Sequence, residues 1–158
     1  MADYYSECAC LIEANPTQAD ILLEAMNELF EPDDSFIQKL ISCDNTNGLS
    51  EMEIIVRHCV LNHPFRNVAD IPEDLDWHFD GEKCPEGFLI NSDLGDFNSE
   101  HGALFAQAAL IAFDRNELIE FKIAFTCSNL KRPDGFGGAA CVVRSEERRV
   151  GKECRSRW

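Results

Sequence analysis

Two stretches of the chain alternate apolar and polar residues with a period of two, the pattern of a strand with one buried face. In residues 4–13 one face carries Ser6, Cys8, Cys10 and Ile12, and the other carries Tyr5, Glu7, Ala9, Leu11 and Glu13. Residues 117–127 alternate in the same way, with Ile119, Phe121, Ile123, Phe125 and Cys127 on the apolar face. A Gly- and Pro-containing loop over 128–138 follows, and residues 139–143 predict a final strand.

Four other segments show helical spacing. A capping pattern at Thr17 and Asp20 begins a helix that ends before Pro32, and residues 35–43 form a second helical patch. The capping box Ser50-x-x-Glu53 begins a third helix, which ends near Asn62. Asn98 caps a fourth helix over 99–113, and this helix has so little polar surface that we expect it to be the most buried.

A hairpin is predicted between the third and fourth helices. Trp77, His78 and Phe79 indicate a short strand that ends at Asp80-Gly81 and is followed by Cys84-Pro85, and residues 87–91 indicate its partner strand.

This order of elements predicts an α+β fold. We expect a two-layer sandwich with a mainly antiparallel sheet, of the ferredoxin-like βαββαβ type, with a helical insert and an extra C-terminal strand. A parallel α/β sheet is the alternative, because helices and strands partly alternate. The predicted centre of the core is Leu104, Phe105, Ala108, Ile111, Ile119, Phe121, Ile123 and Phe125.

The length and composition favour one globular domain. The chain has 158 residues, of which 45% are hydrophobic, so one core of ordinary size is expected. Its apolar stretches are shorter than the roughly 20 residues that span a bilayer, and Asp3 and Glu7 do not suit a signal peptide. These features predict a cytoplasmic protein.

The last fifteen residues, 144–158, differ from the rest of the chain. They hold six of the 14 basic residues and show no clear periodicity. The whole string RSEERRVGKECRSRW resembles the translation of a sequencing-library adapter, so we interpret it as an artefact tail that follows a single domain over 1–143. The natural C-terminus then lies near Val143 or beyond this fragment. The alternative is a solvated basic tail that binds nucleic acid.

The domain without this tail is strongly acidic. The whole chain has a formal net charge of −15, and residues 1–143 hold 8 basic and 26 acidic residues, a net charge of −18. Seven cysteines lie in this part, without a C-x-x-C pair, which predicts reduced and mostly buried thiols rather than a disulfide framework.

The acidic charge is concentrated in residues 67–100, where ten carboxylates accompany a single basic residue, Lys83. Such a surface can present a negative field to a basic protein groove, as a nucleic-acid backbone does. The alternative is a solvated face that keeps the protein soluble. The spacing does not fit an EF-hand loop. The residues that we predict to bind a partner are Asp70, Glu73, Asp74, Asp76, Trp77, Asp80, Glu82 and Glu86.

Two other chemistries are weaker candidates. Cys8, Cys10 and His58 would form a metal-dependent structural module, but the Cys8-x-Cys10 spacing on a strand is poor for zinc. Cys127 with His101 as its base would form a small thiol-dependent enzyme, but alternation places Cys127 on an apolar face.

The C-terminal part of the domain resembles a known group of proteins. The run FKIAFTCS (121–128) followed by RPDGFGGAA (132–140) resembles small uncharacterised proteins of phages, plasmids and other bacterial mobile elements that end in a T-C-S…F-G-G-G-A run. Ala139 stands where that group has its third consecutive glycine. The resemblance implies a bacterial or phage setting and assigns no catalytic residue.

These observations together predict a non-enzymatic acidic binding protein, an antagonist encoded by a mobile element, that occupies a basic groove of a nucleic-acid-binding host protein. We expect no cofactor, no metal, no membrane and no direct contact with nucleic acid. The oligomeric state does not follow from the sequence.

Overall fold

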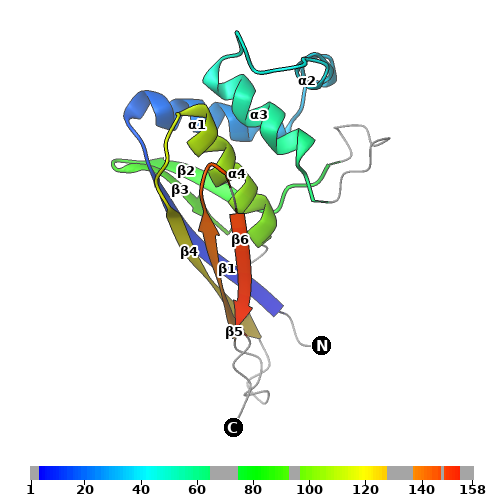
Figure 1. The fold of residues 1–158 in the computed structure, drawn as a ribbon. Helices are drawn as coiled ribbons and strands as arrows, with labels where there is room; N and C mark the ends of the chain where they lie inside the picture. Colours follow the sequence, from blue (N-terminus) through cyan, green and yellow to red (C-terminus); the bar gives the residue numbers. More distant parts are fainter. Residues whose placement is uncertain (1–3, 65–74, 93–96, 128–136, 147, 154–158) are drawn as a thin grey trace.

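A computed structural model describes residues 4–64, 75–92, 97–127, 137–146 and 148–153. Within this part the chain folds as an α+β structure, with four helices and six strands (Figure 1). The strands lie in the order β2-β3-β1-β4-β5-β6, and every neighbouring pair is antiparallel. The predicted antiparallel α+β class is therefore confirmed, and the parallel alternative is wrong.

Both alternating segments are strands near the middle of the sheet. β1 (Tyr4–Glu13) pairs with β4 (Ile119–Cys127), and β4 pairs in turn with β5 (Gly137–Val143). The faces follow the sequence pattern: Cys8, Cys10 and Ile12 are buried, whereas Ala9 and Leu11 are exposed.

Ser50 and Asn98 cap helices as the sequence predicted, whereas the predicted cap at Thr17 is wrong, because the first helix already begins at Pro16. Asn15 and Ser50 close capping boxes at the start of α1 (Pro16–Phe30) and α3 (Glu51–Leu61). Asp33 and Asn98 accept backbone N–H groups at the start of α2 (Asp34–Ile41) and α4 (Ser99–Ala112). Each cap satisfies N–H groups that have no partner inside the helix.

The helices cover one face of the sheet in two tiers. α1 packs over β2 and β3, and α4 packs over β5 and β6. The predicted insert, α2 and α3, lies outside this tier, since α3 packs on α1 and α4, and α2 packs on α3 (Figure 1). The opposite face of the sheet carries the exposed side chains Ala9, Leu11, Glu120, Ala124 and Ala140.

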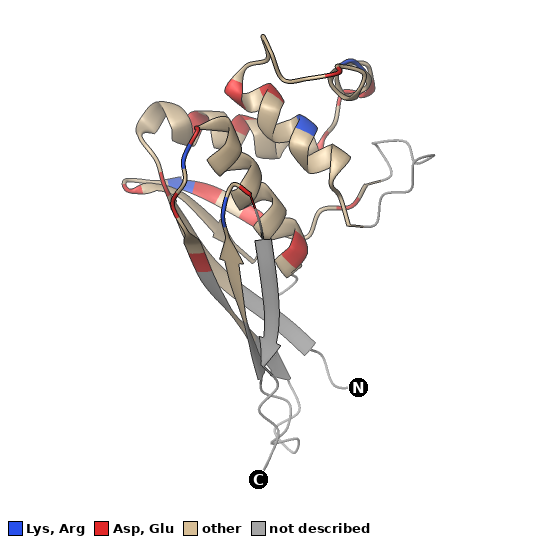
Figure 2. Cartoon of the chain, in the orientation of Figure 1, with Lys and Arg blue, Asp and Glu red and all other residues tan. Residues whose placement is uncertain are grey.

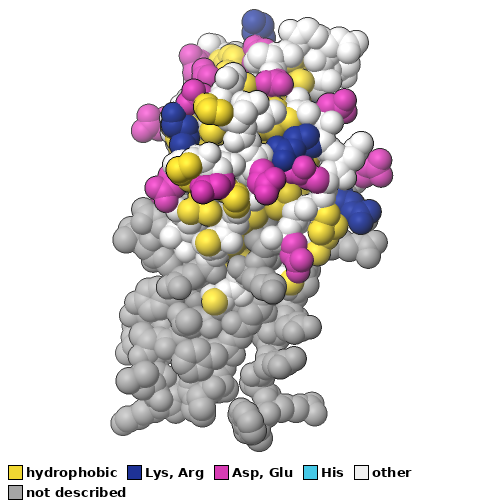
Figure 3. Space-filling model, turned by 90° about the vertical axis from the view of Figure 1, so that its left-hand side faces the viewer, with side chains coloured by type: hydrophobic (Ala, Val, Ile, Leu, Met, Phe, Trp, Pro, Cys, Tyr) yellow, Lys and Arg dark blue, Asp and Glu magenta, His cyan; other side chains and the backbone are white. Residues whose placement is uncertain are grey.

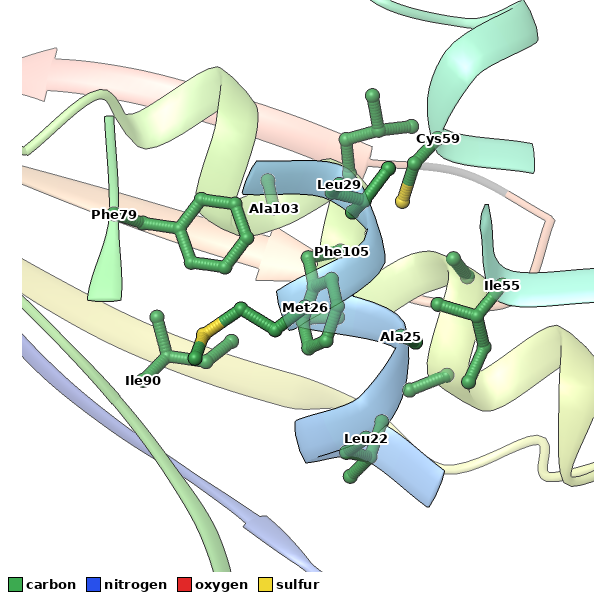
Figure 4. Close-up of a cluster of buried hydrophobic side chains, with 14 of the residues drawn as sticks. Leu22, Ala25, Met26, Leu29, Ile55, Cys59, Phe79, Ile90, Ala103 and Phe105 are labelled. Carbon is green, nitrogen blue, oxygen red and sulfur yellow. The ribbon is translucent and has the colours of Figure 1, made fainter. Parts of the chain in front are cut away.

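The core forms where α1 and α4 meet the sheet. Met26 reaches from α1 into a cluster with Phe79, Ile90 and Phe105 (Figure 4). Every residue of α4 from His101 to Leu110 is buried, so the expectation that this helix is the most enclosed is confirmed. Of the predicted core residues, Leu104, Phe105, Ala108, Ile119 and Ile123 are buried and Ile111 is half-buried; the side chains of Phe121 and Phe125 lie outside the described residues.

The predicted hairpin is present, but the predicted position of its first strand is wrong. β2 (Asp80–Cys84) starts where the sequence indicated that the strand ends, and the turn to β3 (Gly87–Asn91) follows Cys84. Gly81 serves packing instead, because a Cβ atom built on it would lie 2.5 Å from the ring of Phe88. The turn needs Gly87, which has φ +150° and passes so close to β1 that a Cβ would lie 2.2 Å from the Ile12 carbonyl oxygen.

A strand inside the basic tail was not expected. β6 (Arg148–Glu153) pairs with the outer edge of β5, from Val143 opposite Arg148 to Gly138 opposite Glu153. An edge strand offers a row of unpaired backbone groups, which can accept a segment without requiring an apolar pattern in it. The absence of strand periodicity in the tail therefore misled the prediction of its structure.

Candidate partner-binding surface

The structure describes part of the predicted acidic surface. Asp76, Glu82 and Glu86 are exposed and Asp80 is half-buried. Asp70, Glu73 and Asp74 lie outside the described residues. The described carboxylates follow one path, from the segment before β2, along β2, to the turn after it.

β2 sorts its charges onto two sides. Glu82 pairs opposite Leu89, and Lys83 pairs opposite the buried Phe88, so Lys83 lies on the side of the helices. Its Nζ atom is 2.5 Å from Oδ1 of Asp20 on α1. Asp80 and Glu82 lie two residues apart on the other side, about 7 Å along the strand. They therefore face away from Lys83, the residue that follows Glu82.

The basic side chains described within residues 1–143 are mostly engaged within the protein. Arg57 donates to the carbonyl oxygens of Leu40 and Cys43, at 3.2 and 2.8 Å, where α2 ends. Arg115 donates to the Glu13 carbonyl and pairs with Glu117, and Lys83 pairs with Asp20.

Acidic positions occur on the helices and on the β2–β3 hairpin (Figure 2). In Figure 3 they are spread over the described part of one molecular face, with a few basic side chains between them. Arg57, Lys83 and Arg115 already hold contacts within the protein, so they neutralise few of these carboxylates.

Trp77 does not belong to the surface. Its side chain is only 9% exposed and packs against two buried histidines, His63 and His101, with ring centroids at 4.7 and 5.4 Å. The indole is therefore part of the core, which is a correction to its predicted role in binding a partner. No local pattern signals this cluster, because its rings come from three separate segments.

The residues of the metal hypothesis lie in different environments. Cys8 and Cys10 are buried beneath the helices, and burial raises the pKa of the Cys8 thiol to about 11 and that of the Cys10 thiol to about 12. His58 lies on α3, where its Nε2 atom is 3.2 Å from Oε1 of Gln107 on α4. No group of three or more candidate metal ligands occurs among the described residues.

Of the two residues of the thiol-enzyme hypothesis, the structure describes the side chain of His101 alone. His101 is 1% exposed, and its Nδ1 atom accepts a hydrogen bond from the backbone N–H of His78. Cys127 ends β4, opposite Tyr4, and its side chain lies outside the described residues. The His101 imidazole thus already uses Nδ1 for a structural contact.

Among the described helices, none has the length and apolar character needed to cross a membrane. Comparison of the chain with protein-family models, with curated proteins and with solved structures found no match.

Proposed function

We propose that this protein is a non-enzymatic acidic binding protein that occupies a basic groove of a nucleic-acid-binding protein. The observation that carries the proposal is the imbalance of charge at the surface. Asp76, Glu82 and Glu86 are exposed, whereas Arg57, Lys83 and Arg115 are engaged within the protein.

The arrangement of β2 favours a protein groove as the partner. Carboxylates spaced along an extended strand present a row of charges, as phosphates do along a nucleic-acid backbone. A row of like charges raises the rate of encounter with a basic cleft through long-range attraction. A single bound cation would instead need converging ligands.

We further propose that the first four strands form a ferredoxin-like unit. Their order, β2-β3-β1-β4, and the helical connections that follow β1 and β3 support this assignment. The α2–α3 pair is then the insert, and β5 is the added strand. The resemblance of residues 121–140 to proteins of bacterial mobile elements supports a cytoplasmic antagonist of a host protein.

The test begins with a pull-down from bacterial lysate. Proteins that the full chain captures are identified, and double-stranded DNA is then added as a competitor. We expect a captured nucleic-acid-binding protein to be displaced by DNA, and its association to slow as salt rises, because the Debye length falls from about 10 Å at 0.1 M to about 3 Å at 1 M. Capture that neither DNA nor salt affects would contradict the proposal.

A charge reversal then tests the surface itself. We expect Asp76→Lys, Glu82→Lys and Glu86→Lys together to slow association with the captured protein by about tenfold or more. The matched control reverses three other exposed carboxylates, Glu24, Glu31 and Asp44, which changes the net charge equally. Equal slowing by both sets would show that only total charge matters.

A further inference from the structure

The segment that leads into β2 is attached to the helical layer by three hydrogen bonds. Nε2 of His63, after α3, lies 3.0 Å from the carbonyl oxygen of Asp76. The backbone N–H of His78 donates to Nδ1 of His101 at 3.1 Å, and the His78 carbonyl accepts the backbone N–H of Asn98 at 2.7 Å. These contacts hold residues 76–78 against the start of α4.

The two imidazoles have opposite roles in this attachment. A carbonyl oxygen only accepts, so His63 donates through Nε2, and it can do so whether its ring is neutral or protonated. A backbone N–H only donates, so Nδ1 of His101 must be unprotonated. Protonation therefore preserves the bond from His63 and removes the bond to His101.

The surroundings of His101 make its protonation disruptive. The ring is 1% exposed and lies 4.8 Å from the ring of His63, 5.7 Å from that of His78 and 5.4 Å from that of Trp77. A buried cation beside two other imidazoles is costly.

Other groups near this segment act in the opposite direction. The carboxylates of Asp76, on the attached segment, and Glu100, on α4, are exposed and favour a cation nearby.

We propose that His101 is an acid-sensitive latch, whose protonation at Nδ1 breaks the bond from the His78 N–H and loosens residues 77–79 against the start of α4. The bonds from His63 to Asp76 and from Asn98 to His78 remain, so the segment stays attached at these two points. The bonded state requires an unprotonated Nδ1, so acidification favours the loosened state. The latch does not depend on the proposed function, and it controls the exposure of Trp77.

The indole of Trp77 provides the readout. The chain has two tryptophans, so the full chain with Trp158→Phe leaves Trp77 as the sole indole. We expect its emission to shift reversibly to longer wavelength as the pH falls from 7.5 to 5.0, with a midpoint below about 6.5. Far-UV circular dichroism should stay nearly constant, because the helices and the sheet persist.

Substitutions identify the responsible ring. In His101→Asn the side-chain oxygen takes the place of Nδ1 and does not titrate, so the emission change should vanish or move down by at least one pH unit. His78→Gln is the control, since it removes a neighbouring titratable ring and leaves both the backbone N–H of residue 78 and the acceptor on His101. It should retain the transition.

Several results would overturn the latch. These are a constant emission in the parent protein, an unchanged transition in His101→Asn, or loss of circular dichroism at the same pH. If His101→Asn does not fold, the proposal can still be tested by a measurement on the protein that retains His101. Nitrogen-15 NMR at pH 7.5 should show His101 protonated at Nε2 and unprotonated at Nδ1, and any other state contradicts the proposal.

Discussion

Replacing Gly81 with alanine tests whether this glycine serves packing or a turn. An added Cβ would lie 2.5 Å from Cε1 and Cζ of Phe88 and 3.2 Å from Sδ of Met26. Phe88 is fully buried and packs against Phe105, with ring centroids 5.9 Å apart, so the ring has little room to retreat.

The expected cost follows from two opposing terms. Overpacking a core costs about 1–3 kcal/mol. Gly81 has no positive φ, so alanine is free of backbone strain and gains about 0.4–1 kcal/mol by restricting the unfolded chain. We therefore expect Gly81→Ala to lower the free energy of unfolding by about 1–2 kcal/mol, or Tm by about 2–8 °C.

A double-mutant cycle gives the decisive assay. Urea unfolding is measured for Gly81→Ala, for Phe88→Leu and for the pair. Leucine lacks the ring atoms that the new Cβ meets, so the alanine should cost much less in the Phe88→Leu background, with a coupling of about 1 kcal/mol or more.

Gly48→Ala is the backbone control for this cycle. Gly48 has φ +80° and no atom within 4 Å of a built Cβ, so its cost should not depend on Phe88. The packing argument fails if Gly81→Ala is neutral, or if its cost is the same in both backgrounds.

Four further predictions concern a cap, the reactivity and titration of the buried thiols, and the tail. Ser50→Ala should lower stability by about 1 kcal/mol, because Ser50 Oγ accepts the Glu53 N–H, whereas Ser42→Ala should cost less in the same thermal melts. Cys8 and Cys10 should resist a thiol reagent at pH 8 while the half-buried Cys43 and Cys84 react first; rapid labelling of Cys8 in the native protein would contradict its burial. Because the pKa values of Cys8 and Cys10 are raised, the unfolded thiols lose protons first, so stability should fall as the pH rises above about 9; equal stability at pH 8 and 10.5 would disagree. Removing residues 147–158 should change Tm by less than about 2 °C, because β6 pairs on one side only and the Ser145 carbonyl that accepts from Gln107 is kept; a loss of several degrees would show that the tail belongs to the domain.

The pattern of the sequence determined most of the local structure. The period of two in residues 4–13 placed β1, and the capping box at Ser50 placed the start of α3. These features depend on side chains a few residues apart, so they can be recognised without knowing the rest of the fold. The concentration of carboxylates before and along β2 was equally visible.

Only the tertiary structure decided what several of these residues do. Gly81 follows an Asp, as in a turn, yet it lies within a strand because Phe88 packs against its Cα. Trp77 lies among charged residues in the sequence, yet it is buried by two histidines, His63 and His101, from distant segments. Local pattern shows which positions are apolar and where a strongly capped helix starts, but contacts between distant segments depend on how the strands pair and which helix covers them. The opposite hydrogen-bonding roles of the two imidazoles, one as donor and one as acceptor, arise from that packing alone.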